Sequence, residues 1–272
     1  MRRKKLPFLI IGLSILILFL FMALFPQAFT KMGRKESFGA LLPPSSSHIL
    51  GTNSLGYDIF TELVYGARET IVTALSAAIL ALTLGTIIGM LAGAKGFLGT
   101  LFGGITDMFI MLPKLIVLIV LSAFIGGSTV GLIVLIGIFC WTSTARAVRA
   151  KVIHLRSLSF IEGCKMYGYS PIHTAVRHII PNLSDVLLSR FLLGINGCIM
   201  MESTLSFLGF GNLYYPTWGV MINFARSRGG IISGSIHYIF APCVCIMLLS
   251  LSFYFIFIYL EGRRETLKDP EY

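Results

Sequence analysis

FIEGCKMYGYSPIHTAVRHIIPN, residues Phe160 to Asn182, is the longest polar and cation-bearing interruption between two apolar segments of this chain. It predicts two short helices joined by an elbow. Ser157 or Ser159 is suited to cap the first helix, and Gly168 to end it, because glycine tolerates the left-handed conformation. Ser170-Pro171 then starts a second helix, with a hydroxyl cap and a residue that needs no N–H. A rigid elbow of this kind suits contact with a soluble partner.

Composition places the elbow in a membrane protein. The 272 residues are 56% hydrophobic and only 12% charged, with a mean hydropathy of +0.85, which is too apolar for a soluble globule. The net charge of +10 comes without the basic and aromatic interleaving of nucleic-acid binders, so we expect lipid and no nucleic acid as a partner. Five cysteines, mostly in apolar runs and without a CxxC pair, predict neither disulfides nor a metal site.

Six apolar segments are predicted to cross the membrane, so the expected fold is an all-α polytopic bundle. They are Leu6–Phe25, Thr70–Ala92, Leu101–Ile125, Val130–Val148, Leu183–Met201 and Ile236–Leu260. Amphipathic residues Ile59–Glu69 are predicted to lie along the outer interface. The expected division is residues 1–25 (tail and first span), 26–69 (extracytoplasmic segment with that interfacial helix) and 70–272 (core, with a cytosolic coupling loop at 149–182 and an outer loop at 202–235).

The distribution of positive charge sets the orientation. Of the 22 Lys and Arg residues, 15 fall on the predicted inner side, six on the outer side and one, Lys114, inside a span. This bias predicts that both termini are cytosolic. A cleaved signal peptide is the rival interpretation of Leu6–Phe25, but the apolar run is longer than usual and no small-x-small cleavage site follows it.

Several residues in or near the spans suggest particular roles. Gly85, Gly89 and Gly93 recur every four residues and predict a smooth face for close helix packing. Pro113 predicts a kink in the third span. Its neighbour Lys114 either lines a translocation path or extends its ammonium group to the interface.

Two further polar residues have alternative interpretations. Glu202 either binds a cationic group of a substrate in the path or caps a helix N-terminus, and we expect the cap. His48 invites a metal interpretation, but a single histidine beside a turn more often forms hydrogen bonds. We therefore expect no metal ligands.

The elbow also carries a family resemblance. The order Glu162-x5-Gly168-x9-His178-x-x-Pro181-Asn182 resembles the EAA loop of ABC-importer permeases. The resemblance implies a type I importer permease fold whose elbow docks into a groove on an ATPase subunit. The coupling residues that it implies are Glu162, Gly163, Cys164, Gly168, Ser170, His178, Pro181 and Asn182. Gly163 and Cys164 replace two alanines of the family pattern but are still small.

Further motifs, in the same order as in the family, extend the resemblance over nearly the whole chain. They are similar to those of the subclass for dipeptides, oligopeptides and nickel, with departures at Asn53, Tyr57, Ser203 and Phe210. The motifs are HILGTNSLGYD at 48–58, LVYGAR at 63–68, WTSTARAVR at 141–149, ESTLSFLGFG at 202–211 and PTWGVM at 216–221.

The chain has no P-loop, no HExxH and no nucleophile elbow, so it is expected to be a transport subunit and not an enzyme. The resemblance implies a second permease subunit, two ATPase subunits that use ATP and Mg, and an extracytoplasmic substrate-binding protein. No cofactor is expected on this chain.

Peptides are the first expected substrate, and nickel or a metal chelate is the alternative. A secondary transporter is the alternative class, but it would favour inverted repeats and ion-binding groups at the midplane, which this sequence does not show.

Overall fold

The computed structural model describes residues 2–227 and 236–268, and within these ranges the chain is helical without a named strand. Five helical segments are long and apolar enough to cross a membrane, and a bent pair of helices supplies a sixth if it is taken as one span. The five are Leu6–Leu24, Ile59–Ala92, Thr129–Arg156, Pro181–Phe210 and His237–Gly262. The predicted all-α polytopic fold is therefore confirmed.

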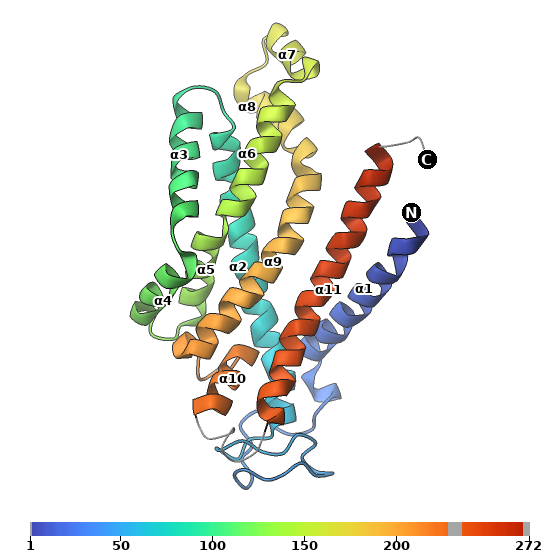
Figure 1. Ribbon diagram of the computed structural model, residues 1–272, viewed down its shortest axis with the longest axis vertical. Coiled ribbons are helices and arrows are strands. Elements are labelled where there is room, and N and C mark those ends of the chain that lie inside the picture. Colours follow the sequence, from blue (N-terminus) through green and yellow to red (C-terminus); the bar gives the residue numbers. More distant parts are fainter. Residues whose placement is uncertain (1, 228–235, 269–272) are drawn as a thin grey trace.

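Helix α2 (Ile59–Ala92) is the centre of the bundle. It contacts α1 (Arg2–Leu24), α3 (Phe97–Met111), α5 (Thr129–Cys140), α6 (Thr142–Arg156), α9 (Ser184–Leu205) and α10 (Trp218–Ser227). Helices α1 and α11 (His237–Lys268) lie side by side along one flank (Figure 1). The main apolar core draws side chains from these helices, except α3 and α6, and from α4 (Lys114–Ile125), so the spans form one packed unit.

The start of α2 differs from the prediction. The sequence predicts an interfacial piece at Ile59–Glu69 and a separate span from Thr70, but α2 is one helix of 34 residues. The Asp58 carboxylate caps it by accepting from the Thr61 N–H at 2.7 Å. Val64 and other apolar residues of the first turns are buried in the core, so the amphipathic face packs on protein and not on lipid.

The third predicted span is broken. Helix α3 and helix α4 (Lys114–Ile125) meet at an angle of 86°, and Figure 1 shows α4 lying across the direction of α3. Leu112 is extended, with φ −68° and ψ 134°, as expected for a residue before proline. Pro113 also removes one backbone donor, so Leu101–Ile125 is a sharply bent pair and not the kinked helix that the sequence predicts.

The remaining elements run from α5 through the elbow to the last helix. A turn with positive φ at Gly126 and Gly127 precedes α5, and the Ser128 hydroxyl caps that helix. The other elements are η1 (Pro26–Ala28), α6 (Thr142–Arg156), α7 (Ser159–Met166), α8 (Pro171–Thr174), η2 (Ala175–Ile179), η3 (Pro181–Leu183), α9 (Ser184–Leu205), η4 (Ser206–Phe210) and α10 (Trp218–Ser227). Residues 228–235 of the predicted outer loop lie outside the described residues.

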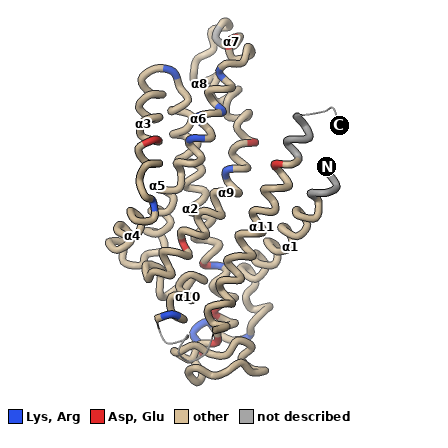
Figure 2. The backbone as a smooth tube through the Cα atoms, in the orientation of Figure 1, with Lys and Arg blue, Asp and Glu red and all other residues tan. Residues whose placement is uncertain are grey.

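The two ends of the bundle are different. The start of α1, the end of α11 and the elbow formed by α7 and α8 lie at one end, and residues 26–58 lie at the other (Figure 1). Figure 2 shows long stretches of α1, α2, α5 and α11 without a charged residue between these ends. The elbow and both ends of the described chain therefore share one side of the apolar bundle.

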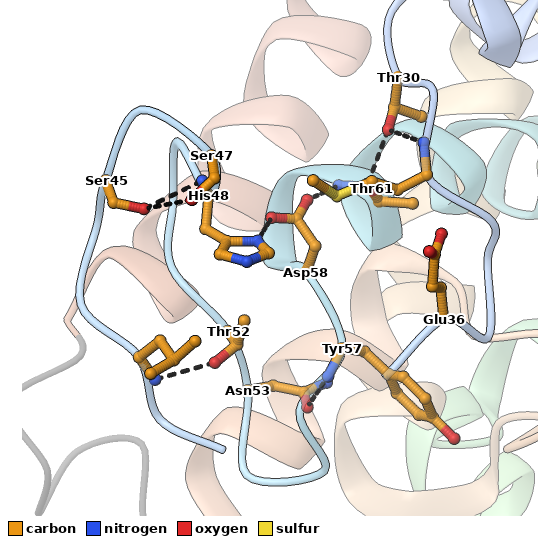
Figure 3. A network of polar contacts seen from close by, with 12 residues as sticks. Thr30, Glu36, Ser45, Ser47, His48, Thr52, Asn53, Tyr57, Asp58 and Thr61 are labelled. Carbon is orange, nitrogen blue, oxygen red and sulfur yellow. Dashed lines mark hydrogen bonds and ion pairs between the residues drawn. The ribbon is translucent and has the colours of Figure 1, made fainter. Parts of the chain in front are cut away.

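The segment before α2 is folded by its own polar side chains (Figure 3). His48 Nδ1 lies 3.0 Å from Asp58 Oδ2, so His48 forms a hydrogen bond, as predicted. The hydroxyls of Thr30 and Thr61 lie 2.8 Å apart. The Thr52 hydroxyl donates to the Gly39 carbonyl at 2.6 Å.

The Asn53 amide joins this segment to α2 and α11. Its Oδ1 accepts from the N–H groups of Leu55 and Tyr57 at 2.8 and 3.0 Å, and its Nδ2 donates to Glu62 Oε2 at 2.9 Å. The Tyr238 hydroxyl also donates to Glu62 at 3.3 Å. A buried carboxylate is stabilised by such donors, which hold residues 26–58 to the bundle.

Candidate functional site

The elbow begins where α6 ends. The Ser157 hydroxyl donates to the His154 carbonyl at 2.8 Å, so it closes the end of α6 and does not cap α7. Ser159 is itself the first residue of α7, and its hydroxyl bonds none of the described residues. The capping role predicted for these two serines is therefore wrong.

The stop and restart inside the elbow follow the prediction. Gly168 has φ +76°, and the Tyr169 N–H donates to the Cys164 carbonyl at 3.0 Å across it. The Ser170 hydroxyl then accepts from the His173 N–H at 3.1 Å, and α8 begins with the predicted proline. The turn between the two helices is therefore fixed by local backbone chemistry.

The second arm of the elbow continues into α9 through changes of helix type. The π-helical turn η2 closes with the Ile180 N–H donating to the Ala175 carbonyl at 2.9 Å. Pro181, which has no N–H, starts the short 3₁₀ turn η3, and Asn182 Nδ2 donates back to the His178 carbonyl at 2.7 Å. Pro181 thus marks a junction within the arm.

A small apolar core anchors both arms to the spans. It is separate from the main core and gathers buried residues of α6, α7, η2 and η3. The residues are Val148, Val152, Leu155, Ile161, Ile179 and Leu183. Because these side chains pack together and Leu187 of α9 packs against them, the elbow is joined to both α6 and α9.

The tip of the elbow leaves large apolar side chains exposed. Met166, Tyr167 and Ile172 are 88%, 83% and 77% exposed. Glu162, on the outer side of α7, is also exposed and makes no ion pair with the residues that the structure describes. An exposed apolar cluster with a charge beside it is typical of a protein-binding surface.

Between the arms lies a hollow of about 440 Å³. Aromatic rings and nitrogen-bearing side chains form its walls. The lining residues are Phe160, Gly163, Cys164, Tyr167, Tyr169, His173, Arg177 and His178.

The predicted coupling residues occupy three environments at the elbow. Glu162, Gly168, Ser170, Pro181 and Asn182 are exposed. Gly163 and His178 are half-buried and line the hollow together with the buried Cys164. Met166, Tyr167 and Ile172 are further candidate contacts, which the motifs of the sequence do not mark. The signal that could have found them is the presence of large apolar residues in predicted helices that are too short to bury them.

The three glycines of α2 face α6, the helix that leads into the elbow. A Cβ at Gly85 would lie 2.6 Å from Thr144 Cβ, and one at Gly89 would lie 2.6 Å from the Ala145 carbonyl oxygen. At Gly93 it would lie 2.6 Å from a methyl group of Val152. The two backbones therefore approach closely, and no larger side chain fits without moving α6.

Lys114 lies at the break between α3 and α4. Its ammonium group donates to the Thr142 hydroxyl at 2.8 Å, which joins the start of α4 to the start of α6. Asp107, on α3, lies 3.5 Å from Arg149 and 3.9 Å from Arg146. Lys114 is thus held in a contact within the chain, between two helix starts.

Glu202 lies inside α9 and is fully buried. Its Oε1 accepts from the hydroxyls of Ser206 and Thr217 at 2.6 and 2.7 Å, and the Ser203 hydroxyl lies 3.4 Å from Oε2. This environment differs from both predicted roles. The carboxylate is enclosed by the described residues, and Thr217, which precedes α10, contacts it through its hydroxyl and not through a helix N–H.

Comparisons with known proteins agree with the geometry. A family model described as "Binding-protein-dependent transport system inner membrane component" matches residues 81–266. A dipeptide transport system permease protein of Bacillus subtilis (strain 168) is 31% identical over 248 residues, which cover 89% of this chain and 76% of that protein. An oligopeptide transport system permease protein of the same organism is 30% identical, with 78% and 70% covered. A glutathione transport system permease protein of Pectobacterium atrosepticum is 32% identical, with 68% and 62% covered.

Proposed function

This chain belongs to the family of binding-protein-dependent transport system inner membrane components, and we propose that it is a permease subunit of an ATP-driven peptide importer. It is a multi-pass protein of the cytoplasmic membrane. The observation that carries the proposal is the elbow, an exposed apolar surface anchored to α6 and α9 at the end where α1 starts. Membership of the family removes the support for a secondary transporter.

Peptides are the proposed substrate class. The related proteins are described as permeases for dipeptides, oligopeptides and glutathione, all of which contain peptide bonds. Nickel or a metal chelate remains the competing substrate in the experiment below.

The proposed assembly contains four other subunits or proteins. A second permease subunit completes the path through the membrane, and two ATPase subunits bind ATP and Mg on the cytosolic side. A substrate-binding protein delivers the peptide to the end formed by residues 26–58. The bias of Lys and Arg toward the elbow side supports this orientation, with both termini in the cytosol.

Coupling follows from the packing of the elbow. When the ATPase pair closes on ATP, the elbow moves with it, and the anchoring core transmits this movement to α6 and α9. The glycine face of α2 keeps α6 and α2 in register, so the bundle responds as a unit. Transport against a gradient then requires that the inward-open and outward-open states bind the peptide with different affinity.

Co-purification with the ATPase subunits tests the docking role. The wild-type permease should retain the ATPase subunits in detergent, and Glu162→Arg and Gly168→Pro should each lose them. Lys95→Glu is the matched control, since Lys95 is exposed on the turn between α2 and α3 at the same end. Retention by both elbow variants at the wild-type level would contradict the proposal.

Uptake by proteoliposomes that contain the complete importer tests the substrate. A labelled dipeptide should enter only with ATP and the binding protein, and nickel chloride or a nickel chelate should not compete. Competition by nickel in place of peptide would overturn the substrate assignment. Uptake by the permease alone would overturn the ATP-driven mechanism.

A further inference from the structure

The hollow between α7 and the second arm of the elbow is rich in hydrogen-bond donors. Arg177 and two histidines, His173 and His178, contribute to its wall, and the lining residues include no Asp or Glu. Arg177 is exposed and forms no ion pair with the described part of the chain. The hollow therefore offers positive charge that the described residues leave uncompensated.

The rings of the hollow are held in place. The Tyr169 ring stacks on His173 with centroids 4.8 Å apart and planes at 19°, and the His173 and His178 centroids lie 6.2 Å apart. The stacking on Tyr169 and the short helical arm place the His173 and His178 rings in the same wall as Arg177.

The carboxylate of the elbow itself, that of Glu162, lies on a different face of α7 from the hollow. Along α7, Phe160, Gly163 and Tyr167 follow the spacing of one helical face, and this face lines the hollow. Glu162 and Met166 fall on the opposite face of the same helix, roughly half a turn away. The elbow thus presents a carboxylate on one side and guanidinium and imidazole groups on the other.

From this arrangement we infer that the hollow receives the carboxylate of an Asp or Glu side chain of the ATPase subunit, with Arg177 as its ion-pair partner. The inference rests on the proposed function, because the exposed Tyr167 and Ile172 at the rim are covered only if the ATPase docks there. An arginine beside a partly enclosed carboxylate forms a strong and directional contact. Docking then uses two opposite charges, that of Glu162 on the face of α7 away from the hollow and that of Arg177 in the wall of the hollow.

The test measures the affinity of purified ATPase subunits for the full permease in nanodiscs. Arg177→Glu reverses the charge in the hollow. Gly163→Phe fills the hollow without a charge change, because a Cβ at Gly163 meets no atom within 4 Å. Lys95→Glu is the control for charge, and Ile172→Asp is the control for docking through the exposed tip. Each variant is checked for wild-type thermal unfolding before its affinity is measured.

We expect Arg177→Glu and Gly163→Phe each to weaken ATPase binding about tenfold or more, and Lys95→Glu to leave it unchanged. Replacement of one acidic residue on the docking face of the ATPase by Arg should restore binding to Arg177→Glu and to no other variant. Wild-type affinity in both hollow variants, with binding lost in Ile172→Asp, would overturn the inference and leave the proposed function standing. Failure of the wild-type permease to bind the ATPase would overturn both.

Discussion

Residues 26–58, the proposed outer segment, and the elbow are both irregular polar stretches between spans, but they differ in how their side chains are partnered. In the outer segment Thr52, Asn53 and Asp58 are buried and bonded to their own chain (Figure 3). At the elbow Tyr167 and Ile172 are exposed. Several polar side chains of the outer segment are therefore partnered within the chain, whereas the elbow leaves large apolar side chains uncovered for the proposed ATPase contact.

This difference has an energetic consequence. Removal of a buried side chain of the outer end leaves a cavity or an unsatisfied polar group, so it lowers the free energy of unfolding. Removal of an exposed side chain of the elbow costs the isolated chain little and instead weakens binding. Matched substitutions at the two ends therefore test the comparison directly.

The largest difference is expected between two aromatic residues. Trp218 is fully buried, and its indole N–H donates to the Leu63 carbonyl at 2.9 Å. Trp218→Ala should lower the free energy of unfolding by about 3–5 kcal/mol, and Tyr167→Ala by less than about 0.5 kcal/mol. Unfolding of the solubilised chain by heat or by denaturing detergent measures both. Equal losses in the two variants would break the comparison.

A smaller difference is expected between two asparagines. Asn53→Ala removes the donor to Glu62 and the acceptor for two backbone N–H groups, at a cost of about 1–3 kcal/mol. Asn182→Ala removes one exposed bond to His178 and should cost about 0.5 kcal/mol. The same unfolding assay gives the order, and a larger loss for Asn182→Ala would show that the elbow is the more rigid end.

The smallest difference is expected between two helix caps. Asp58→Ala removes the cap of α2 and the contact with His48, and should cost about 1–2 kcal/mol. Ser170→Ala removes only the cap of the short α8 and should cost about 0.5 kcal/mol. ATPase binding should fall only in Ser170→Ala. A loss of binding in Asp58→Ala at a temperature where the chain is folded would contradict the separation of the two ends.

Much of the fold could be predicted from the sequence because its signals are local. Apolar runs mark the spans, and Gly168 and Ser170 mark the turn of the elbow through backbone conformation and a hydroxyl cap. The spacing of the α2 glycines predicts a packing face, and the structure shows α6 against it. These features depend on residues within a few positions of one another.

The features that the sequence did not reveal depend on distant contacts. Pro113 predicts a bend, but the 86° angle depends on how α4 packs on α5 and α9. From the sequence, Glu202 could bind a substrate or cap a helix, because the hydroxyl that donates to it belongs to Thr217, 15 residues later, and is not a local signal. Ile59–Glu69 looked interfacial because its polar residues bond to a segment that has no regular structure of its own. In the same way, exposure of the elbow tip is visible only once the anchoring core is known.

Site-specific photocrosslinking in the complete importer shows which end of the bundle contacts the ATPase subunits. A photoreactive residue is placed at Ile172 on the elbow and, as the matched position, at the exposed Leu55 of the outer segment. We expect position 172 to crosslink to an ATPase subunit and position 55 not to do so. A crosslink from position 55 to the ATPase, or from position 172 to the substrate-binding protein, would contradict this expectation.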